Sequence, residues 1–108
     1  MKIMEYMRGH TILLDGAMGT LLQKRGLQPG ELPERWNISH PADVSAIHRA
    51  YYDAGSNVVI SNTFGANTLK YSLPELEAIV DEVVDNIAKN RMKDGFFISN
   101  PISIIPLL

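Results

Sequence analysis

Two short polar turns carry the residues of this chain whose types and spacing are best suited to chemistry. The first contains a carboxylate and two glycines, Asp15, Gly16 and Gly19, and follows an apolar run that ends at Leu14. The second spans residues 62–67 and has the one-letter sequence NTFGAN. In α/β proteins, ligands bind in polar turns at the carboxyl ends of parallel strands. The two turns therefore predict two halves of one small-molecule pocket.

The elements before each turn are predicted from apolar runs and turn residues. Residues 11–15 are expected to form a short strand, because an apolar run here ends at an Asp-Gly step. A short helix is expected over residues 17–25, with Gly26 as its stop. Residues 28–37 contain Pro-Gly and a further Pro and are predicted to be loop.

The next helix is expected to begin at Pro41 and to end at Gly55, since Pro favours the first helical position and Gly ends helices. Its apolar face is predicted from residues spaced three and four apart, namely Val44, Ile47, Ala50, Tyr51 and Ala54. Residues 58–60 are β-branched throughout, a pattern typical of a parallel strand covered on both faces.

A third helix is predicted with a capping box formed by Ser72 and Glu75 and a stop at Asp94-Gly95. Its buried stripe is expected to contain Leu76, Ile79, Val80, Val83, Val84 and Ile87. Residues 96–98 then begin a third strand. Strands that alternate with helices predict an α/β fold with parallel strands.

Composition excludes several classes of function. The 108 residues carry a net charge of −2, which gives no electrostatic basis for binding nucleic acid. No apolar run approaches the length of a membrane span or a signal peptide, so we expect a cytoplasmic protein with no membrane partner. The chain has no cysteine, and its three histidines lack metal-ligand spacing, so no metal ligands are predicted.

The last residues form an apolar tail. Residues 96–108 contain no charged side chain. Such a segment is expected to pack in a core or to need a partner, and three parallel strands also leave two open edges. Self-association of the chain is therefore one expectation.

Several motifs in order resemble the start of the homocysteine S-methyltransferase family. In one-letter code they are LDGAMGT at 14–20, HP at 40–41, HRAY at 48–51, AGSN at 54–57 and SNTFGAN at 61–67. This family includes the homocysteine-binding module of cobalamin-dependent methionine synthase and betaine–homocysteine methyltransferase. The resemblance covers roughly residues 12–91, and the sequence departs from the family pattern after residue 98.

The resemblance implies the fold and the activity. The family fold is a (β/α)8 TIM barrel of about 250 residues. Residues 1–108 would supply a partial homocysteine-binding barrel domain, with residues 1–10 as a lead-in, two β/α units, a possible third strand and a divergent tail at 96–108. The family transfers a methyl group to the homocysteine thiolate and forms methionine.

The resemblance also implies cofactors. Family members bind zinc through cysteines on later strands, and members of the methionine synthase type also use cobalamin and methyltetrahydrofolate. The zinc ligands are absent from this sequence, so the chain alone is expected to be inactive, with no catalytic residue of its own. The alternative interpretation is a non-catalytic fragment that self-associates or forms part of a split barrel.

By the same resemblance, the first turn binds the amino-acid end of homocysteine. Asp15 would bind the ammonium group, and the N–H groups of the turn would bind the carboxylate. The residues of this half are Asp15, Gly16, Ala17, Gly19 and Thr20. The alternatives are that Asp15 caps the following helix and that the glycines serve a tight turn only.

Asn62, Thr63 and Phe64 would line the same pocket near the thiol. The alternative for Asn62 and Thr63 is ordinary turn chemistry at the end of a strand. For Phe64 the favoured alternative is packing in the core.

Overall fold

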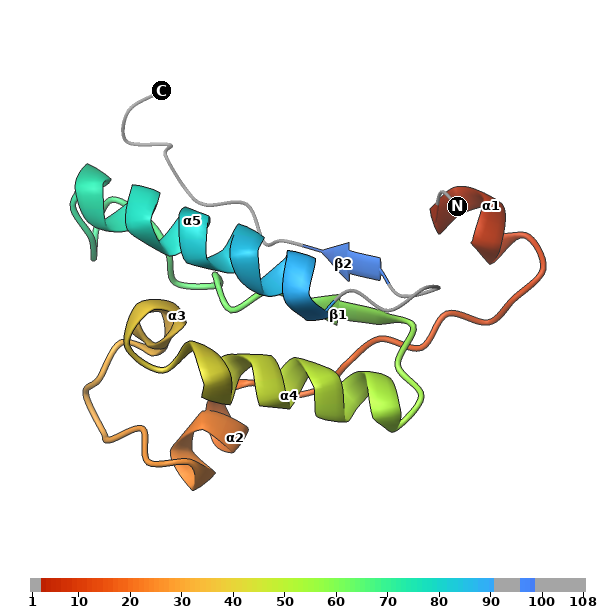
Figure 1. Ribbon diagram of the computed structural model, residues 1–108, viewed down its shortest axis with the longest axis horizontal. Coiled ribbons are helices and arrows are strands. Elements are labelled where there is room, and N and C mark those ends of the chain that lie inside the picture. The colour runs from red at the N-terminus through yellow and green to blue at the C-terminus, as the bar shows by residue number, and fades with distance from the viewer. Residues whose placement is uncertain (1–2, 91–95, 99–108) are drawn as a thin grey trace.

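The computed structural model describes residues 3–90 and 96–98. A layer of helices covers one face of a small parallel sheet, and α4 and α5 lie side by side in that layer (Figure 1). The helices are α1 (Ile3–Met7), α2 (Gly19–Lys24), the 3-10 helix η1 (Pro33–Arg35), α3 (Trp36–Ser39), α4 (Pro41–Asp53) and α5 (Leu73–Asn90). The strands are β1 (Val58–Ile60) and β2 (Phe96–Ile98).

The sheet confirms the expected parallel pairing. Val58 pairs with Phe96, Val59 with Phe97 and Ile60 with Ile98, all in parallel register. On its other side β1 receives the amino-terminal segment through one parallel bridge, between Leu14 and Val58. Strands joined in parallel need a long crossover, and α5 provides it between β1 and β2.

The strand expected at residues 11–15 is wrong, because this segment makes only that single bridge. On either side of the bridge, a side-chain oxygen accepts the hydrogen bond that a backbone carbonyl would accept in a regular ladder. The Asn57 Oδ1 atom accepts a hydrogen bond from the Leu13 amide at 3.0 Å, and the Asp15 Oδ2 atom accepts one from the Ile60 amide at 3.0 Å. A regular ladder would take the Ile60 amide to the Asp15 carbonyl, so the carboxylate ends the pairing.

The helix ends follow their local signals. Gly26 and Gly55 adopt positive φ angles of 117° and 113° just after α2 and α4, as expected for helix-stopping glycines. The capping box is also present: the Ser72 amide donates to Glu75 Oε2 at 3.0 Å, and the Glu75 amide donates to Ser72 Oγ at 3.3 Å. The predicted stop at Asp94-Gly95 lies outside the described residues.

Two further elements differ from the sequence prediction. The short helix begins at Gly19 rather than at Ala17, and the stretch expected to be loop at residues 28–37 contains η1 and the start of α3. The helical segment is held by Trp36, whose indole is buried and donates to Glu31 Oε2 at 3.1 Å. Trp36 buries a large apolar surface, and this tertiary packing outweighs the local turn signals.

The core has two hydrophobic clusters on the helix layer. One joins α2, α3 and α4 and contains Leu22, Leu27, Trp36, Val44 and Ile47. The other joins α5 to the second turn and contains Ala66, Tyr71, Leu76, Ile79 and Val83. The two clusters place both candidate turns against packed helices.

The helix faces are only partly as predicted. On α4, Ala50 and Ala54 are exposed, whereas His48 and Tyr52 are buried. On α5, Val80 and Val84 are 37% and 59% exposed. The three- and four-residue spacing of apolar side chains alone overestimates the width of the buried helix face. Only the residues that face a neighbouring element lose contact with water. The side chain of Ile87 lies outside the described part.

His48 makes the fold sensitive to acid. It is 2% exposed in α4, and burial lowers the pKa of its imidazole from 6.5 to about 4. The folded state therefore prefers neutral His48, and the stability that this contributes is present above pH 6.5 and lost as the pH falls towards 4. We expect this histidine to lower the free energy of unfolding by about 3 kcal/mol over that range.

Urea unfolding of the wild-type protein and of His48→Gln between pH 7 and 4 checks this prediction. The variant should show a flatter pH dependence than the wild type. His10→Gln, which changes an exposed histidine, is the control and should keep the wild-type slope. Equal slopes for the wild type and His48→Gln would contradict the prediction.

Candidate functional site

Asp15 lies at the carboxyl end of the sheet, beside the end of β1. Its amide donates to the Val58 carbonyl at 3.0 Å, and its carboxylate accepts the Ile60 amide at 3.0 Å. The second turn begins two residues after Ile60. The two turns predicted to form a pocket therefore follow neighbouring parallel segments at the same edge of the sheet.

The environment of Asp15 favours its neutral form more than water does. Partial burial raises the pKa of the Asp15 carboxyl, and the hydrogen bonds from the Ile60 amide and from its own amide oppose this rise. A partly desolvated carboxylate interacts more strongly with a cation than one in bulk water. The site thus offers an acceptor suited to an ammonium group.

The alternative in which Asp15 caps the helix that follows it, α2, is wrong. Residue 18 is the N-cap of α2, and no side chain makes a capping hydrogen bond there. The Asp15 carboxylate is committed to Ile60 instead. Gly16 and Ala17 precede the helix, whereas Gly19 and Thr20 are its first two residues, and all four are exposed.

Tyr51 of α4 holds the first turn in place. Its hydroxyl donates to the Ala17 carbonyl, and a Cβ atom built on Gly16 would lie 3.0 Å from that hydroxyl oxygen. Burial and the nearby charge of Asp15 raise the pKa of Tyr51. A side chain at residue 16 would therefore require the phenol or the turn to move by a few tenths of an ångström.

Asn62 and Thr63 are directed into the protein. Asn62 is 6% exposed and donates from Nδ2 to the Pro33 carbonyl at 2.8 Å. Thr63 is fully buried, and its hydroxyl lies 2.9 Å from that of Ser61. Their side chains thus fasten the second turn to its surroundings.

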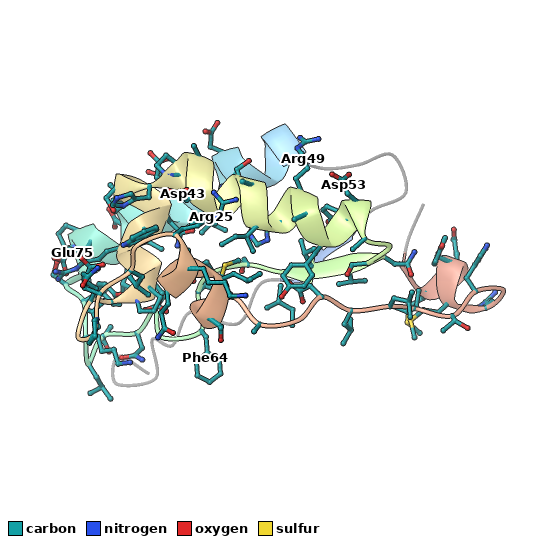
Figure 2. All side chains as sticks on the ribbon, turned by 90° about the horizontal axis from the view of Figure 1, so that it is seen from below. Arg25, Asp43, Arg49, Asp53, Phe64 and Glu75 are labelled. Atoms are coloured by element: carbon teal, nitrogen blue, oxygen red, sulfur yellow. The ribbon has the colours of Figure 1, made fainter. Side chains whose placement is uncertain are left out.

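Phe64 behaves in the opposite way. Core packing, the favoured alternative for this residue, is wrong, because 90% of Phe64 is exposed. Figure 2 shows its ring projecting from the side of the molecule opposite the helix layer. Of the three residues proposed from the second turn, Phe64 is the one that presents its side chain to solvent.

Sequence reasoning missed the roles of two residues that shape the site, Tyr51 and Glu34. Tyr51 was assigned only to the apolar face of a helix, although its hydroxyl reaches the first turn. Glu34 and Asn37 lie in the stretch expected to be loop, yet both are buried and hydrogen-bonded to the second turn. A phenol at the edge of an apolar stripe is a usable signal for Tyr51, but no local pattern marks Glu34.

The described part of the chain has no group of three or more His, Cys, Asp or Glu side chains placed to hold a metal ion. Within the same residues, no helix combines the length and apolar character needed to cross a bilayer.

Comparison with known proteins shows the family. Residues 12–98 match the family model described as homocysteine S-methyltransferase. This chain belongs to that family. The match includes both turns, the two parallel segments that precede them, and β2.

Sequence relatives include two mycobacterial methionine synthases. The chain is 37% identical over 73 residues to the methionine synthase of Mycobacterium leprae. This alignment covers 60% of this chain and 6% of that protein. The chain is 43% identical over 61 residues to the enzyme of Mycobacterium tuberculosis, covering 49% of this chain and 5% of that protein. The chain therefore spans only a small part of the length of these relatives.

Solved structures show the same arrangement. The chain is similar to the homocysteine methyltransferase MmuM from Escherichia coli in its metallated form, with a TM-score of 0.66, 22% identity and coverage of 88% of this chain and 38% of that one. The apo form of MmuM gives a TM-score of 0.57 and 28% identity over 74% of this chain and 28% of that one. The fold of this chain is thus that of part of a homocysteine methyltransferase.

The contact between Gly16 and Tyr51 predicts a large cost for a single methyl group. Gly16→Ala should lower the free energy of unfolding by about 1–3 kcal/mol, because the new Cβ atom forces the turn or the phenol to move. Chemical denaturation measures this cost. The matched control is Gly19→Ala, since a Cβ atom at Gly19 meets nothing within 4 Å.

A Tyr51→Phe protein tests whether the Tyr51 hydroxyl causes the cost of Gly16→Ala. In a Tyr51→Phe protein the hydroxyl that crowds Gly16 is gone, so Gly16→Ala should cost less there than in the wild type. Equal costs at Gly16 and Gly19 would show that the close approach is unimportant.

Proposed function

We propose that this chain is the amino-terminal part of a homocysteine S-methyltransferase barrel and that its two turns bind the amino-acid end of homocysteine. The activity of the complete protein would be transfer of a methyl group to the homocysteine thiolate, which gives methionine. The observation that carries this proposal is the position of Asp15, whose carboxylate lies at the end of β1 beside the second turn.

The first turn supplies the groups that recognise an amino acid. The partly buried carboxylate of Asp15 would accept hydrogen bonds from the ammonium group. The exposed backbone N–H groups of residues 16–20 would bind the substrate carboxylate. Recognition of both charged groups would orient the thiol away from this turn.

The second turn supplies shape rather than charge. Asn62 and Thr63 are committed to hydrogen bonds within the protein, so their role in this proposal is to set the course of the backbone. Phe64 has an exposed ring that would lie against the aliphatic part of the ligand and exclude water from it.

Zinc does not fit the residues of this chain. The sequence contains no cysteine, and the described residues hold no cluster of metal-binding side chains. No step of the reaction is assigned to a metal here. In a complete family enzyme, zinc and the groups that deliver the methyl donor, including cobalamin and methyltetrahydrofolate, would be held by other parts of the barrel or by further domains.

Calorimetric titration with L-homocysteine tests the proposal. The wild-type protein should bind, and Asp15→Asn should raise the dissociation constant about tenfold or more, because the charge is lost while an oxygen remains for the Ile60 amide. Wild-type affinity should also fall as the pH is lowered through the raised pKa of Asp15, whereas the variant should not show this dependence.

Asp53→Asn is the matched control, since Asp53 is an exposed carboxylate at the end of α4 (Figure 2). It should bind like the wild type. If the wild-type protein does not bind homocysteine, the proposed function is wrong. If Asp15→Asn binds as tightly as the wild type, Asp15 is not part of the site.

A second candidate is a non-catalytic chain that pairs with another copy of itself. Leu13 and Leu14 are 54% and 56% exposed on the segment beside β1. Exposed apolar side chains next to a strand favour pairing with a further strand. Light scattering across a concentration series separates the two: a dimer disrupted by Leu13→Lys would favour self-association, and a monomer would exclude it.

A further inference from the structure

Glu34 is a carboxylate that the fold buries among uncharged partners. It lies in η1 and is only 4% exposed. Its Oε2 atom accepts a hydrogen bond from the Gly65 amide at 3.2 Å, and its Oε1 atom accepts one from the Tyr71 hydroxyl at 2.8 Å. Gly65 belongs to the second turn, and Tyr71 lies just before α5.

The Glu34 carboxylate lies so close to the turn that a side chain at residue 65 would have to displace it. A Cβ atom built on Gly65 would lie 2.8 Å from Oε1 and 3.2 Å from Oε2 of Glu34. The 2.8 Å distance is shorter than real Cβ contacts, so any residue other than glycine at this position would force the carboxylate to shift. The carboxylate therefore rests directly on the backbone of the turn.

Two asparagines brace the same pair of segments. Asn37 Nδ2 donates to the Glu34 carbonyl at 2.9 Å and to the Asn62 carbonyl at 2.7 Å. Asn62 Nδ2 donates back to the Pro33 carbonyl at 2.8 Å. The second turn is thus held at two points, at Asn62 by the asparagines and at Gly65 by Glu34.

Burying a carboxylate without a cation is costly, and an apolar side chain of similar size would pack at less cost. The neighbouring guanidinium of Arg35 pairs with Glu75 at the surface instead. Glu34 is nevertheless accommodated, because an amide and a phenol satisfy its oxygens. The hydrogen bonds of this carboxylate hold the turn at Gly65.

We propose that Glu34 is a positioning residue, whose carboxylate fixes the backbone from Asn62 to Gly65 so that the exposed part of the turn, including Phe64, meets the ligand in one geometry. This inference rests on the proposed function for its ligand, homocysteine. Under this inference η1, which lies outside both turns, contributes to homocysteine binding through Glu34. Loss of the Glu34 acceptor should loosen the turn locally and weaken binding without unfolding the helices.

Amide hydrogen exchange and homocysteine titration of the same variants test the inference. Glu34→Met removes both acceptors at similar size, and exchange at Gly65 should become about tenfold faster or more, with a comparable rise in the dissociation constant for homocysteine. Glu34→Gln should restore both values towards the wild type, because its oxygen can accept the Gly65 amide while its NH₂ group donates to the Tyr71 oxygen.

The matched control is Glu31→Met. Glu31 also accepts two hydrogen bonds, from the Gln28 amide and the Trp36 indole, but it has no hydrogen bond to the second turn. This variant should keep wild-type exchange at Gly65. The amide of Ile79, in the buried part of α5, reports global opening, and a purely structural role for Glu34 would accelerate exchange at Ile79 and Gly65 equally.

Two wild-type results in the Glu34→Met variant would overturn the inference. Wild-type exchange at Gly65 and wild-type homocysteine affinity in Glu34→Met would do so while leaving the proposed function in place. If the wild-type protein binds no homocysteine, the proposed function and the role of Glu34 in binding fail together, whereas exchange at Gly65 still decides whether Glu34 fixes the turn.

If Glu34→Met does not fold, Tyr71→Phe takes its place. This change removes only the hydroxyl that orients the carboxylate, so Gly65 should exchange faster than in the wild type and homocysteine should bind more weakly. Wild-type values for both in Tyr71→Phe would likewise overturn the inference.

Discussion

The hydrogen bond from the Ile60 amide to the Asp15 carboxylate joins the two halves of the candidate site. In a longer parallel pair this amide would bind a backbone carbonyl, and the segment before Asp15 would continue as a strand. Because the side chain accepts it instead, backbone pairing stops and the chain is free to turn at Gly16. The same bond holds the carboxylate at the edge of the sheet from which the second turn leaves.

Two side chains of the helix layer contact the two turns closely, each at a glycine. Tyr51 of α4 lies against Gly16, and Glu34 of η1 lies against Gly65. Tyr51 donates to the Ala17 carbonyl, one residue after Gly16, and Glu34 accepts the Gly65 amide. A Cβ atom at either glycine would crowd the polar side chain. Two turns with little core of their own thereby gain defined positions, which a binding site requires if its recognition energy is not to be lost in ordering the loops.

Membership of the homocysteine S-methyltransferase family gives these positions a chemical meaning. The first turn combines a partly buried carboxylate with exposed backbone amides, a combination that complements both charged groups of an amino acid. The second turn presents one exposed aromatic ring, whereas its other residues are buried or, at Asn67, half-buried. Both turns therefore suit recognition of the amino-acid end of the ligand.

Local signals in the sequence determined the parts of the structure whose causes are local. The capping box of Ser72 and Glu75 and the stops at Gly26 and Gly55 depend on neighbours a few residues away. The β-branched run predicted the strand at Val58–Ile60, although its pairing partners lie far along the chain, and the ordered motifs identified the family. Burial of Glu34, exposure of Phe64 and the side-chain partner of Asp15 were not predictable in this way. Each depends on a contact between segments about 30 to 45 residues apart, or on the lack of one, and only the packing of α3, α4 and α5 on the sheet decides which side chains meet.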